Sequence, residues 1–118
     1  MSFPISRVDS VHIAINKSNP PQLQVSAIGE VSSGGWKAPA LVPRIYFMPP
    51  QDGIQDLDFL ATPPGGIAID VMMPLSGDVA ITLVDWMKGV RVHAKTNSVV
   101  AMLTDETKIR KLAPVKLD

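Results

Sequence analysis

The sequence contains no cysteine and few aromatic residues, and both shortages limit what the chain can do. Without cysteine there are no disulfide bonds, no thiolate zinc sites and no thiol catalysis, although the cell compartment stays open. Aromatic residues make up 5% of the chain, and Trp86 is the only one after Phe59. The basic residues of the C-terminal third therefore lack the interleaved aromatic side chains that stack on single-stranded nucleic acid.

The chain also lacks a long apolar run and an excess of charge of either sign. No stretch approaches the roughly 18 apolar residues that a membrane helix requires, and the N-terminal residues show no basic region followed by an apolar run. The 11 acidic and 11 basic residues give a net charge of +0. We therefore predict a soluble protein without nucleic-acid or membrane partners, and its localisation stays unknown.

What the sequence does contain is a two-residue alternation of apolar and polar side chains, which is the period of a β-strand with one buried face. Turn formers separate the runs, most clearly at Asn19-Pro20-Pro21, Ser32-Ser33-Gly34-Gly35 and Pro49-Pro50. About eight such runs follow one another at spacings typical of all-β domains. The pattern predicts an immunoglobulin-like antiparallel β-sandwich of about seven to eight short strands, with a small barrel as the alternative because periodicity does not reveal closure.

The chain is long enough for one domain, and we place its sandwich at residues 1–103. Residues 104–118 have helix chemistry instead. Thr104 is a suitable cap, acidic residues follow in the first turn, basic residues come later, and Pro114 lies beyond the end. We expect a short C-terminal helical turn or a flexible tail there.

Particular runs give sharper expectations. Residues 11–16 and 22–31 are predicted to pair as antiparallel neighbours. Residues 41–48 are predicted as a strand with Ile45 and Phe47 on one face, and Pro43 indicates that it begins late, bulges or lies at a sheet edge.

A further strand is predicted immediately before Pro74. Its apolar face consists of Ile67, Ile69, Val71 and Met73. A turn is predicted to follow at Ser76-Gly77-Asp78, and the next strand has apolar residues on both faces, so it is expected to be covered on both sides.

Charge is distributed unevenly along the chain. No basic residue lies between Arg44 and Lys88, whereas this stretch contains Asp52, Asp56, Asp58, Asp70, Asp78 and Asp85. From Lys88 to Lys111 basic residues outnumber acidic ones. The simpler interpretation is that neighbouring strands neutralise each other across one sheet. The alternative is an acidic and a basic face that meet on adjacent copies of the chain.

Few residues are candidates for catalysis. The only histidines, His12 and His93, fall on the polar side of predicted strands, and no serine-nucleophile motif accompanies them. Asp56 and Asp58 project from one strand face, and with Asp52 in the preceding turn they are candidates for a calcium site or an acid and base pair. A solvated strand face explains the same residues. We predict no enzyme and no cofactor, and keep a hydrolase that uses Asp56, Asp58 or a histidine as a third hypothesis.

Aromatic and sulfur-bearing residues are the better candidates for binding. We single out Trp36, Trp86, Tyr46 and Met72 as ligand or interface residues, because tryptophan anchors interfaces and stacks on sugar rings, and methionine adapts to varied partners. Capping or filling the core is the competing role for each tryptophan and methionine.

The overall composition favours an interaction role. Hydrophobic residues make up 46% of a chain with no net charge, which is more apolar than a monomeric sandwich of this size needs. We therefore predict a non-catalytic β-sandwich interaction module whose partner is another protein or a second copy of the chain. A carbohydrate- or calcium-binding sandwich is the alternative.

Overall fold

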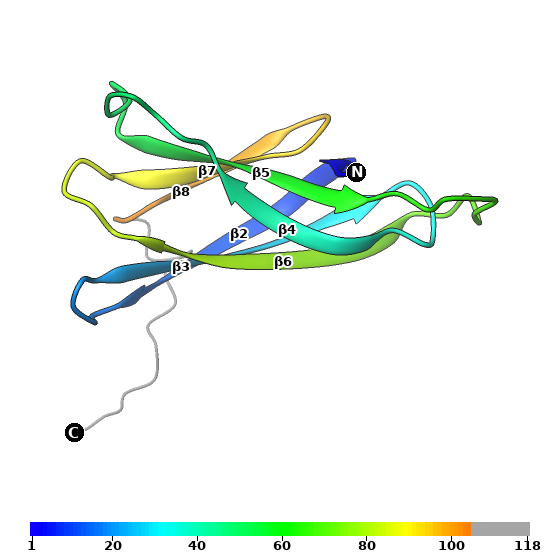
Figure 1. The fold of residues 1–118 in the computed structure, drawn as a ribbon, viewed down its shortest axis with the longest axis horizontal. Helices are drawn as coiled ribbons and strands as arrows, with labels where there is room; N and C mark the ends of the chain where they lie inside the picture. Colours follow the sequence, from blue (N-terminus) through cyan, green and yellow to red (C-terminus); the bar gives the residue numbers. More distant parts are fainter. Residues whose placement is uncertain (105–118) are drawn as a thin grey trace.

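The computed structural model describes residues 1–104, which form a sandwich of two β-sheets without any helix in that range (Figure 1). The eight strands are β1 (Phe3–Pro4), β2 (Arg7–Asn16), β3 (Gln22–Val31), β4 (Lys37–Pro43), β5 (Ile54–Thr62), β6 (Met73–Thr82), β7 (Gly89–His93) and β8 (Ser98–Met102). The predicted all-β class and strand number are confirmed. In the described range no helix could cross a membrane. The helical turn or tail predicted for residues 104–118 lies, apart from Thr104, outside the described residues.

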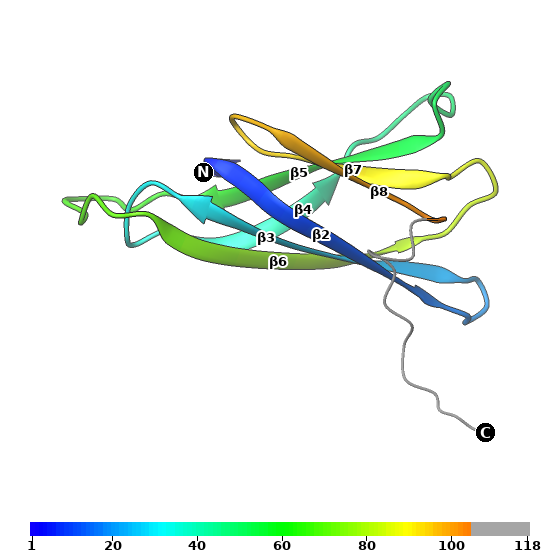
Figure 2. The ribbon, with the colours of Figure 1, turned by 180° about the vertical axis from the view of Figure 1, so that it is seen from behind.

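The strands divide between two sheets that face each other. The β5 sheet is five-stranded, with the order β1-β5-β7-β8 and with β4 paired to β5 as well. The β3 sheet is three-stranded, with the order β2-β3-β6, and β2 pairs with β3 antiparallel as predicted. At the two corners β4 lies beside β6 and β2 beside β8 (Figures 1 and 2). No ladder joins the two sheets within residues 1–104, so this is a sandwich and not a closed barrel.

One strand pair is not antiparallel. β5 and β7 run parallel, with Asp56 opposite Arg91 and Asp58 opposite His93. After β5 the chain crosses to the β3 sheet, where it forms β6, and then returns to the β5 sheet as β7. A parallel pair requires a crossover connection of this kind. The prediction of a purely antiparallel sandwich is therefore wrong for this pair. The alternation of side chains is the same in both kinds of strand and contains no sign of direction.

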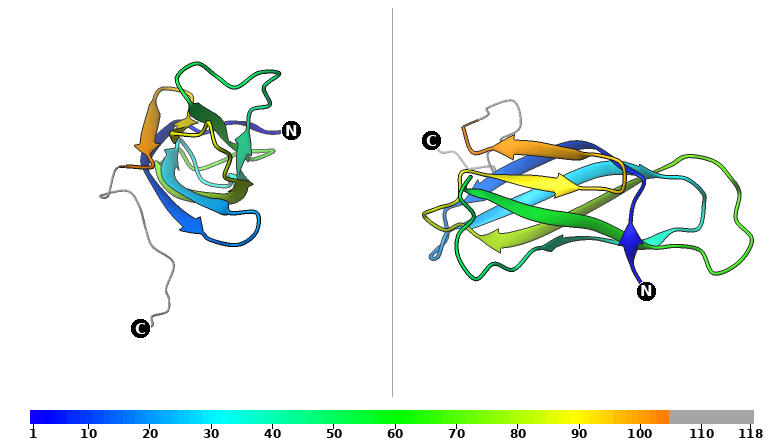
Figure 3. Two further views of the ribbon diagram at one scale, coloured as in Figure 1. Left: turned by 90° about the vertical axis from the view of Figure 1, so that its left-hand side faces the viewer. Right: turned by 90° about the horizontal axis from the view of Figure 1, so that it is seen from above.

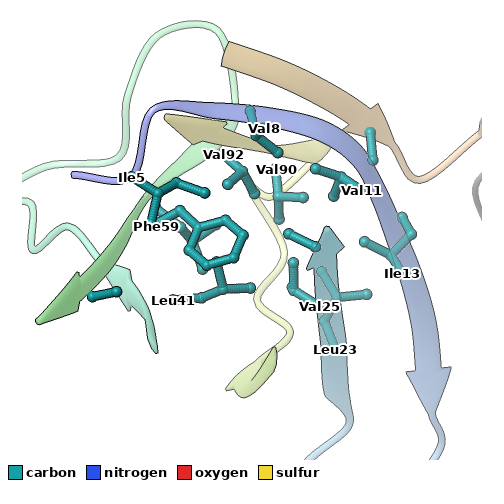
Figure 4. Close-up of a cluster of buried hydrophobic side chains, with 14 of the residues drawn as sticks. Ile5, Val8, Val11, Ile13, Leu23, Val25, Leu41, Phe59, Val90 and Val92 are labelled. Carbon is teal, nitrogen blue, oxygen red and sulfur yellow. The ribbon is translucent and has the colours of Figure 1, made fainter. Parts of the chain in front are cut away.

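The core lies between the sheets, where the apolar face of each strand turns inward. Phe59 is fully buried at its centre (Figure 4). Leu57 and Ala61 share its face of β5 and are also buried. Full burial of such a side chain contributes about 1.5–3 kcal/mol. The cluster is completed from the other strands by Ile5, Val8, Val11, Ile13, Leu23, Val25, Ala27, Val31, Leu41, Met87, Val90, Val92 and Ala101. A core of this extent explains stability without disulfide bonds.

The strand predicted at residues 41–48 is misplaced. β4 starts earlier and ends at Pro43, and residues 44–48 are not in a strand. Ile45 and Phe47 are 97% and 109% exposed, so neither contributes to the core. The Arg44 N–H still donates to the Asp56 carbonyl, but the Asp56 N–H donates to the Tyr46 hydroxyl and not to the Arg44 carbonyl, so the ladder stops there. The edge position predicted from Pro43 is confirmed, and a bulge lies upstream between Lys37 and Ala40.

The strand predicted at residues 67–73 is also wrong. Only Met73 belongs to a strand, where it starts β6, and Ile67 and Ile69 are 106% and 76% exposed. The turn predicted at Ser76-Gly77-Asp78 lies inside β6 instead, because that segment pairs along its whole length with β3. β6 is also not covered on both faces, since Ala80 and Thr82 are exposed.

The two misplaced segments lie far apart in space. The loop of residues 44–53 and the loop of residues 63–72 protrude at opposite ends of the longest axis (Figures 1 and 3). The sandwich therefore presents exposed apolar side chains at both ends.

Candidate functional site

The most elaborate cluster of polar side chains is centred on the Asp56 carboxylate, on the outer face of the β5 sheet. Tyr46 donates its hydroxyl proton to Oδ2 of Asp56 at 2.7 Å, and Arg91 donates from Nη1 to Oδ1 at 3.0 Å. His93 Nε2 lies 2.7 Å from the same Oδ1, which places a proton on Nε2 because a carboxylate only accepts. Asp56 is thus a hub that joins β5, β7 and the loop of residues 44–53.

The parallel pairing of β5 and β7 explains how the hub forms. Residues two apart on a strand project from the same face, so Asp56 and Asp58 lie beside Arg91 and His93 on the outside of the sheet. The side chain of Asp56 is only 15% exposed, and those of Arg91 and His93 are 29% and 26% exposed. A carboxylate this far out of water requires donors, and the neighbouring strand supplies two of them.

Further ion pairs surround the hub. Arg44 forms a bidentate pair with Asp58, from Nε to Oδ2 at 3.1 Å and from Nη2 to Oδ1 at 2.8 Å. Asp52 Oδ2 accepts a hydrogen bond from Arg91 Nη2 at 3.2 Å. These contacts confirm, for this sheet, the simpler interpretation of the uneven charge, in which neighbouring segments neutralise each other.

The network shifts the pKa of several groups. Burial raises the pKa of the Asp56 carboxyl, but its three side-chain donors lower it by more, so its pKa lies below the ordinary value. The backbone N–H of Ile54 is the main reason that the pKa of Asp52 is lowered. Burial raises the pKa of the Tyr46 hydroxyl. All these directions favour ionised aspartates and a neutral tyrosine at neutral pH.

Hydrogen bonds hold the loop of residues 44–53 against β5. The Tyr46 hydroxyl also accepts the backbone N–H of Asp56 at 2.8 Å, and the Arg44 N–H donates to the Asp56 carbonyl at 2.9 Å. Gln55, which is only 7% exposed, donates from Nε2 to the Arg44 carbonyl at 2.9 Å. The backbone on either side of Ile45 is therefore fixed, whereas the side chain of Ile45 points into water.

A second loop, residues 83–88 between β6 and β7, completes this end of the molecule. Trp86 packs edge to face on Tyr46, with ring centroids 6.2 Å apart and planes at 82°. Gly53 allows the approach of the two loops: its φ is 72°, and a Cβ there would lie 3.0 Å from the Trp86 carbonyl oxygen. The Lys88 N–H donates to the Gly53 carbonyl at 2.7 Å.

The two loops enclose an open depression of about 340 Å³. It is lined by Arg44, Tyr46, Phe47, Met48, Pro49, Gln55 and Trp86. We call the exposed side chains of Ile45, Phe47 and Met48, together with this depression, the Phe47 surface. Ile45 and Phe47 are almost completely free of contact with the rest of the chain, and Met48 is 76% exposed.

The geometry gives the calcium prediction no support. Both oxygens of Asp56 and of Asp58 are occupied by protein donors, and Asp52 Oδ1 accepts the Ile54 N–H at 2.9 Å. Across residues 1–104, no three His, Asp or Glu side chains are grouped so that they could hold a metal ion. The donors here are cations, N–H groups and the Tyr46 hydroxyl, which satisfy the carboxylates without a metal.

The hydrolase hypothesis gains no support from the histidines either. Ser98 lies opposite His93 in the β7–β8 ladder, but its hydroxyl forms no hydrogen bond to His93 among the described contacts. A serine nucleophile needs a base within hydrogen-bond reach. His12 lies in the β3 sheet, on the other side of the sandwich, so the two imidazoles do not approach each other.

A second polar row crosses the outer face of the β3 sheet. His12, Ser26 and Asp78 are direct neighbours on β2, β3 and β6, in a shallow depression of about 300 Å³. Adjacent strands lie about 4.8 Å apart, so His12 and Asp78 are separated by roughly twice that distance. Asp78 is therefore not placed to orient the His12 imidazole, as the third member of a catalytic triad must.

The structure brings together two of the four predicted interface residues. Tyr46 and Trp86 meet at the Phe47 surface, whereas Met72 lies in the loop at the opposite end. Trp36 is half-buried against the core and donates from Nε1 to Ser33 Oγ at 3.2 Å, in the manner of a core cap. Trp86 also packs partly against the core.

Sequence reasoning missed Phe47 and Ile45 as exposed residues and His93 and Arg91 as partners of Asp56. The prolines on both sides of residues 44–48 were the available signal for the first pair, because a segment between prolines cannot extend a ladder. The second pair depends on the parallel neighbour of β5, which the sequence pattern does not identify.

A scan against protein-family models finds no match, and searches among curated proteins and solved structures return no significant match.

Proposed function

We propose that this domain is a non-catalytic interaction module that binds another protein through the Phe47 surface. The observation that carries the proposal is the contrast within three consecutive residues. Tyr46 is anchored by two hydrogen bonds to Asp56, while Ile45 and Phe47 on either side are 97% and 109% exposed. Ile45 and Phe47 do not pack in the core, but Tyr46 between them is hydrogen-bonded to β5 and holds both in place.

Rigid presentation favours binding for a physical reason. Ordering a mobile side chain at an interface costs about 0.5–1.5 kcal/mol, and a loop that is already ordered avoids much of the corresponding backbone cost. Exposed aromatic anchors next to a depression are typical centres of binding energy. A side chain that protrudes as far as Phe47 fits a partner with a concave apolar pocket.

The use of the polar groups supports the non-catalytic part of the proposal. The low pKa and full occupation of Asp56 suit a carboxylate that fixes a loop, whereas a general acid or base needs a pKa near the working pH. The immunoglobulin-like classification is also part of the proposal. Two packed sheets of short strands support it, whereas the parallel β5–β7 pair departs from the antiparallel arrangement of that class.

Glycan binding is the second candidate, because Trp86 lines the depression beside polar groups from Arg44 and Gln55. A sugar ring stacked on Trp86 would enter the same depression, so the two candidates share a site but differ in the residues on which they depend.

The test uses quantitative capture of partners by the full chain and by two variants. Phe47→Ser removes the protruding aromatic ring, and the matched control Phe3→Ser changes a residue that is 46% exposed and lies outside the Phe47 surface. We expect a partner protein to be retained by the wild type and the control and to be reduced at least tenfold by Phe47→Ser. Equal retention by all three proteins would contradict the proposal. Perturbation of Trp86 fluorescence by glycans, unaffected by Phe47→Ser, would favour the second candidate.

A further inference from the structure

The other end of the sandwich carries a segment with the sequence pattern of a strand, but no strand among residues 1–104 pairs with it. We call residues 67–72 the Ile69 segment. Ile67, Ile69 and Val71 alternate along it and are 106%, 76% and 45% exposed, and the adjoining Met72 and Met73 are 48% and 42% exposed. Side chains of this kind at alternate positions normally face a core or a neighbouring strand.

The backbone of the segment is also largely unpaired. Gly34 and Val71 both donate their N–H groups to the Ile69 carbonyl at 3.0 Å. These two bonds occupy one edge of the segment. On the other edge, the N–H groups of Ala68, Asp70 and Met72 have no hydrogen-bond partner within residues 1–104. A row of free N–H and carbonyl groups beside exposed apolar side chains is the arrangement to which another strand adds.

The position of the segment explains why no strand within residues 1–104 covers it. It leads directly into β6, whose first residue, Met73, pairs with Val31 at the end of β3. Beyond Val31 the chain turns toward β4 and forms a hydrogen bond with the segment only through the Gly34 N–H, so the Ile69 segment continues past the end of the β3 sheet (Figures 1 and 3). It stands at the tip of the long axis, where a second molecule has free access.

We propose that the Ile69 segments of two copies of this chain pair as antiparallel strands about a two-fold axis at Ile69. In this register Ile69 lies opposite Ile69, and Ile67 lies opposite Val71 of the other copy. Asp70, the only charged residue between Phe59 and Gly77, lies opposite Ala68 and on the other face. All the alternating apolar side chains then share one face, and no like charges are opposed.

The register is specific because the segment is amphipathic. A slip of one residue places Asp70 opposite Ile69 and moves a carboxylate to the apolar face, which a buried strand pair does not tolerate. The two-fold arrangement uses the same patch on both copies, so it closes as a dimer and does not propagate into a filament. This inference concerns a different surface from the proposed function and does not depend on it.

The size of the patch predicts a weak dimer. Burial of one large aliphatic side chain removes about 60–120 Å² of apolar surface, so Ile67, Ile69, Val71 and Met73, which share one face, supply at most roughly 240–480 Å² per copy. A standard stable interface buries about 800 Å² per partner. We therefore expect dissociation in the micromolar range or weaker, with a visible dependence on protein concentration.

The first arm of the test is sedimentation equilibrium of the full chain over a wide range of concentrations. We expect the mass to rise from 12.7 kDa toward about twice that value as the concentration increases. Ile69→Lys opposes two like charges at the axis and should remain monomeric, whereas Ile45→Lys, a matched change at an exposed isoleucine of the Phe47 surface, should dimerise as the wild type does. A monomer at all concentrations would overturn the proposal, as would loss of the dimer in Ile45→Lys alone.

The second arm exploits the absence of cysteine from the chain. Residues directly opposite in an antiparallel pair have Cα atoms about 4.5–5.5 Å apart, which suits a disulfide bond. Under mild oxidation Ile69→Cys should form a covalent dimer at least tenfold faster than Ile45→Cys and Asp70→Cys, because neither of these residues lies opposite its own copy. Equal rates for the three variants would show that the segments do not pair in this register. Masses above that of a dimer would indicate head-to-tail contact and would also overturn it.

Discussion

The Tyr46 hydroxyl and Asp56 are joined by two hydrogen bonds, one to the carboxylate at 2.7 Å and one from the backbone N–H at 2.8 Å. The hydroxyl thus donates and accepts toward the same residue, which fixes the position of the phenolic oxygen. Trp86 then has a fixed surface to pack on. This phenolic oxygen therefore contributes two of the hydrogen bonds that hold the Phe47 surface in place.

Removal of that oxygen should cost stability. Tyr46→Phe keeps the ring but leaves the Asp56 N–H and one carboxylate oxygen without their partner in a site that is mostly shielded from water. We expect a loss of about 1–3 kcal/mol in the free energy of unfolding, measured by urea titration. The reverse change at the neighbouring exposed residue, Phe47→Tyr, should alter stability by less than about 0.5 kcal/mol. Similar values for both variants would mean that the two hydrogen bonds do not hold the loop.

The low pKa of Asp56 predicts how stability depends on pH. The pKa in the folded protein lies below the ordinary value of about 3.9, so ionised Asp56 contributes stability that is fully present well above pH 4. That contribution is lost as the pH falls through the folded-state pKa. The gap in unfolding free energy between the wild type and Asp56→Asn should therefore be largest near pH 7 and shrink between about pH 5 and pH 3.

Asp70→Asn is the control for this experiment, because the Asp70 side chain forms no hydrogen bond within the described part of the chain. It should track the wild type across the whole pH range. A gap for Asp56→Asn that stays constant down to pH 3 would show that ionisation of Asp56 does not contribute to folding.

Alternation along the sequence was sufficient to predict the class of the fold and most of its core. Where a run pairs with a strand of similar length, its apolar face is buried as expected. Ile13 on β2 and Val25 on β3 are an example, because they lie opposite each other and are both buried. Ile69 has the same pattern and is exposed, because β3 ends before it. Periodicity reports which side chains would share a face, but burial also requires a second element to cover that face.

Less of the candidate site could be predicted from the sequence. Asp56 was recognised as one of a cluster of aspartates, but its donors come from positions 10, 35 and 37 residues away. They converge because β5 and β7 are parallel neighbours, a relationship set by the crossover through β6. A single sequence without pairing information contains no signal for such contacts.

Two phenylalanines in one chain provide a direct test of the burial assignments. Phe59 is completely buried, and its replacement by alanine should cost about 3–5 kcal/mol in unfolding free energy. Phe47 is fully exposed, and Phe47→Ala should change stability by less than about 0.5 kcal/mol. Urea titrations followed by tryptophan fluorescence measure both. A large loss for Phe47→Ala would place that ring in the core and remove it from the Phe47 surface.

Gly29 is predicted to be intolerant of any side chain. It lies on β3 opposite Val8, at the irregularity in the β2 ladder, and a Cβ there would overlap the Arg7 carbonyl oxygen and lie 2.5 Å from Ile5 Cδ1. Because one of these atoms belongs to the backbone, relief requires movement of β2. We expect Gly29→Ala to destabilise the protein by about 1–3 kcal/mol or more.

Gly34→Ala is the matched substitution, since nothing lies within 4 Å of a Cβ at that position. Its thermal unfolding midpoint should stay within a few degrees of the wild type. Equal midpoints for the two alanine variants would contradict the tight contact at Gly29.

Calcium should not stabilise this protein, although the sequence pattern makes Asp52, Asp56 and Asp58 candidate calcium ligands. Each carboxylate already accepts hydrogen bonds from a cation or an N–H group, so a calcium ion would have to displace Arg44 or Arg91 before binding. We expect 10 mM calcium chloride to change the unfolding midpoint no more than magnesium chloride does at the same concentration. A site with a dissociation constant of about 0.1–1 mM, typical of extracellular calcium modules, would add roughly 1.4–2.7 kcal/mol at that concentration. Such a gain would raise the midpoint by several degrees, and its disappearance in Asp52→Asn would assign calcium to this cluster.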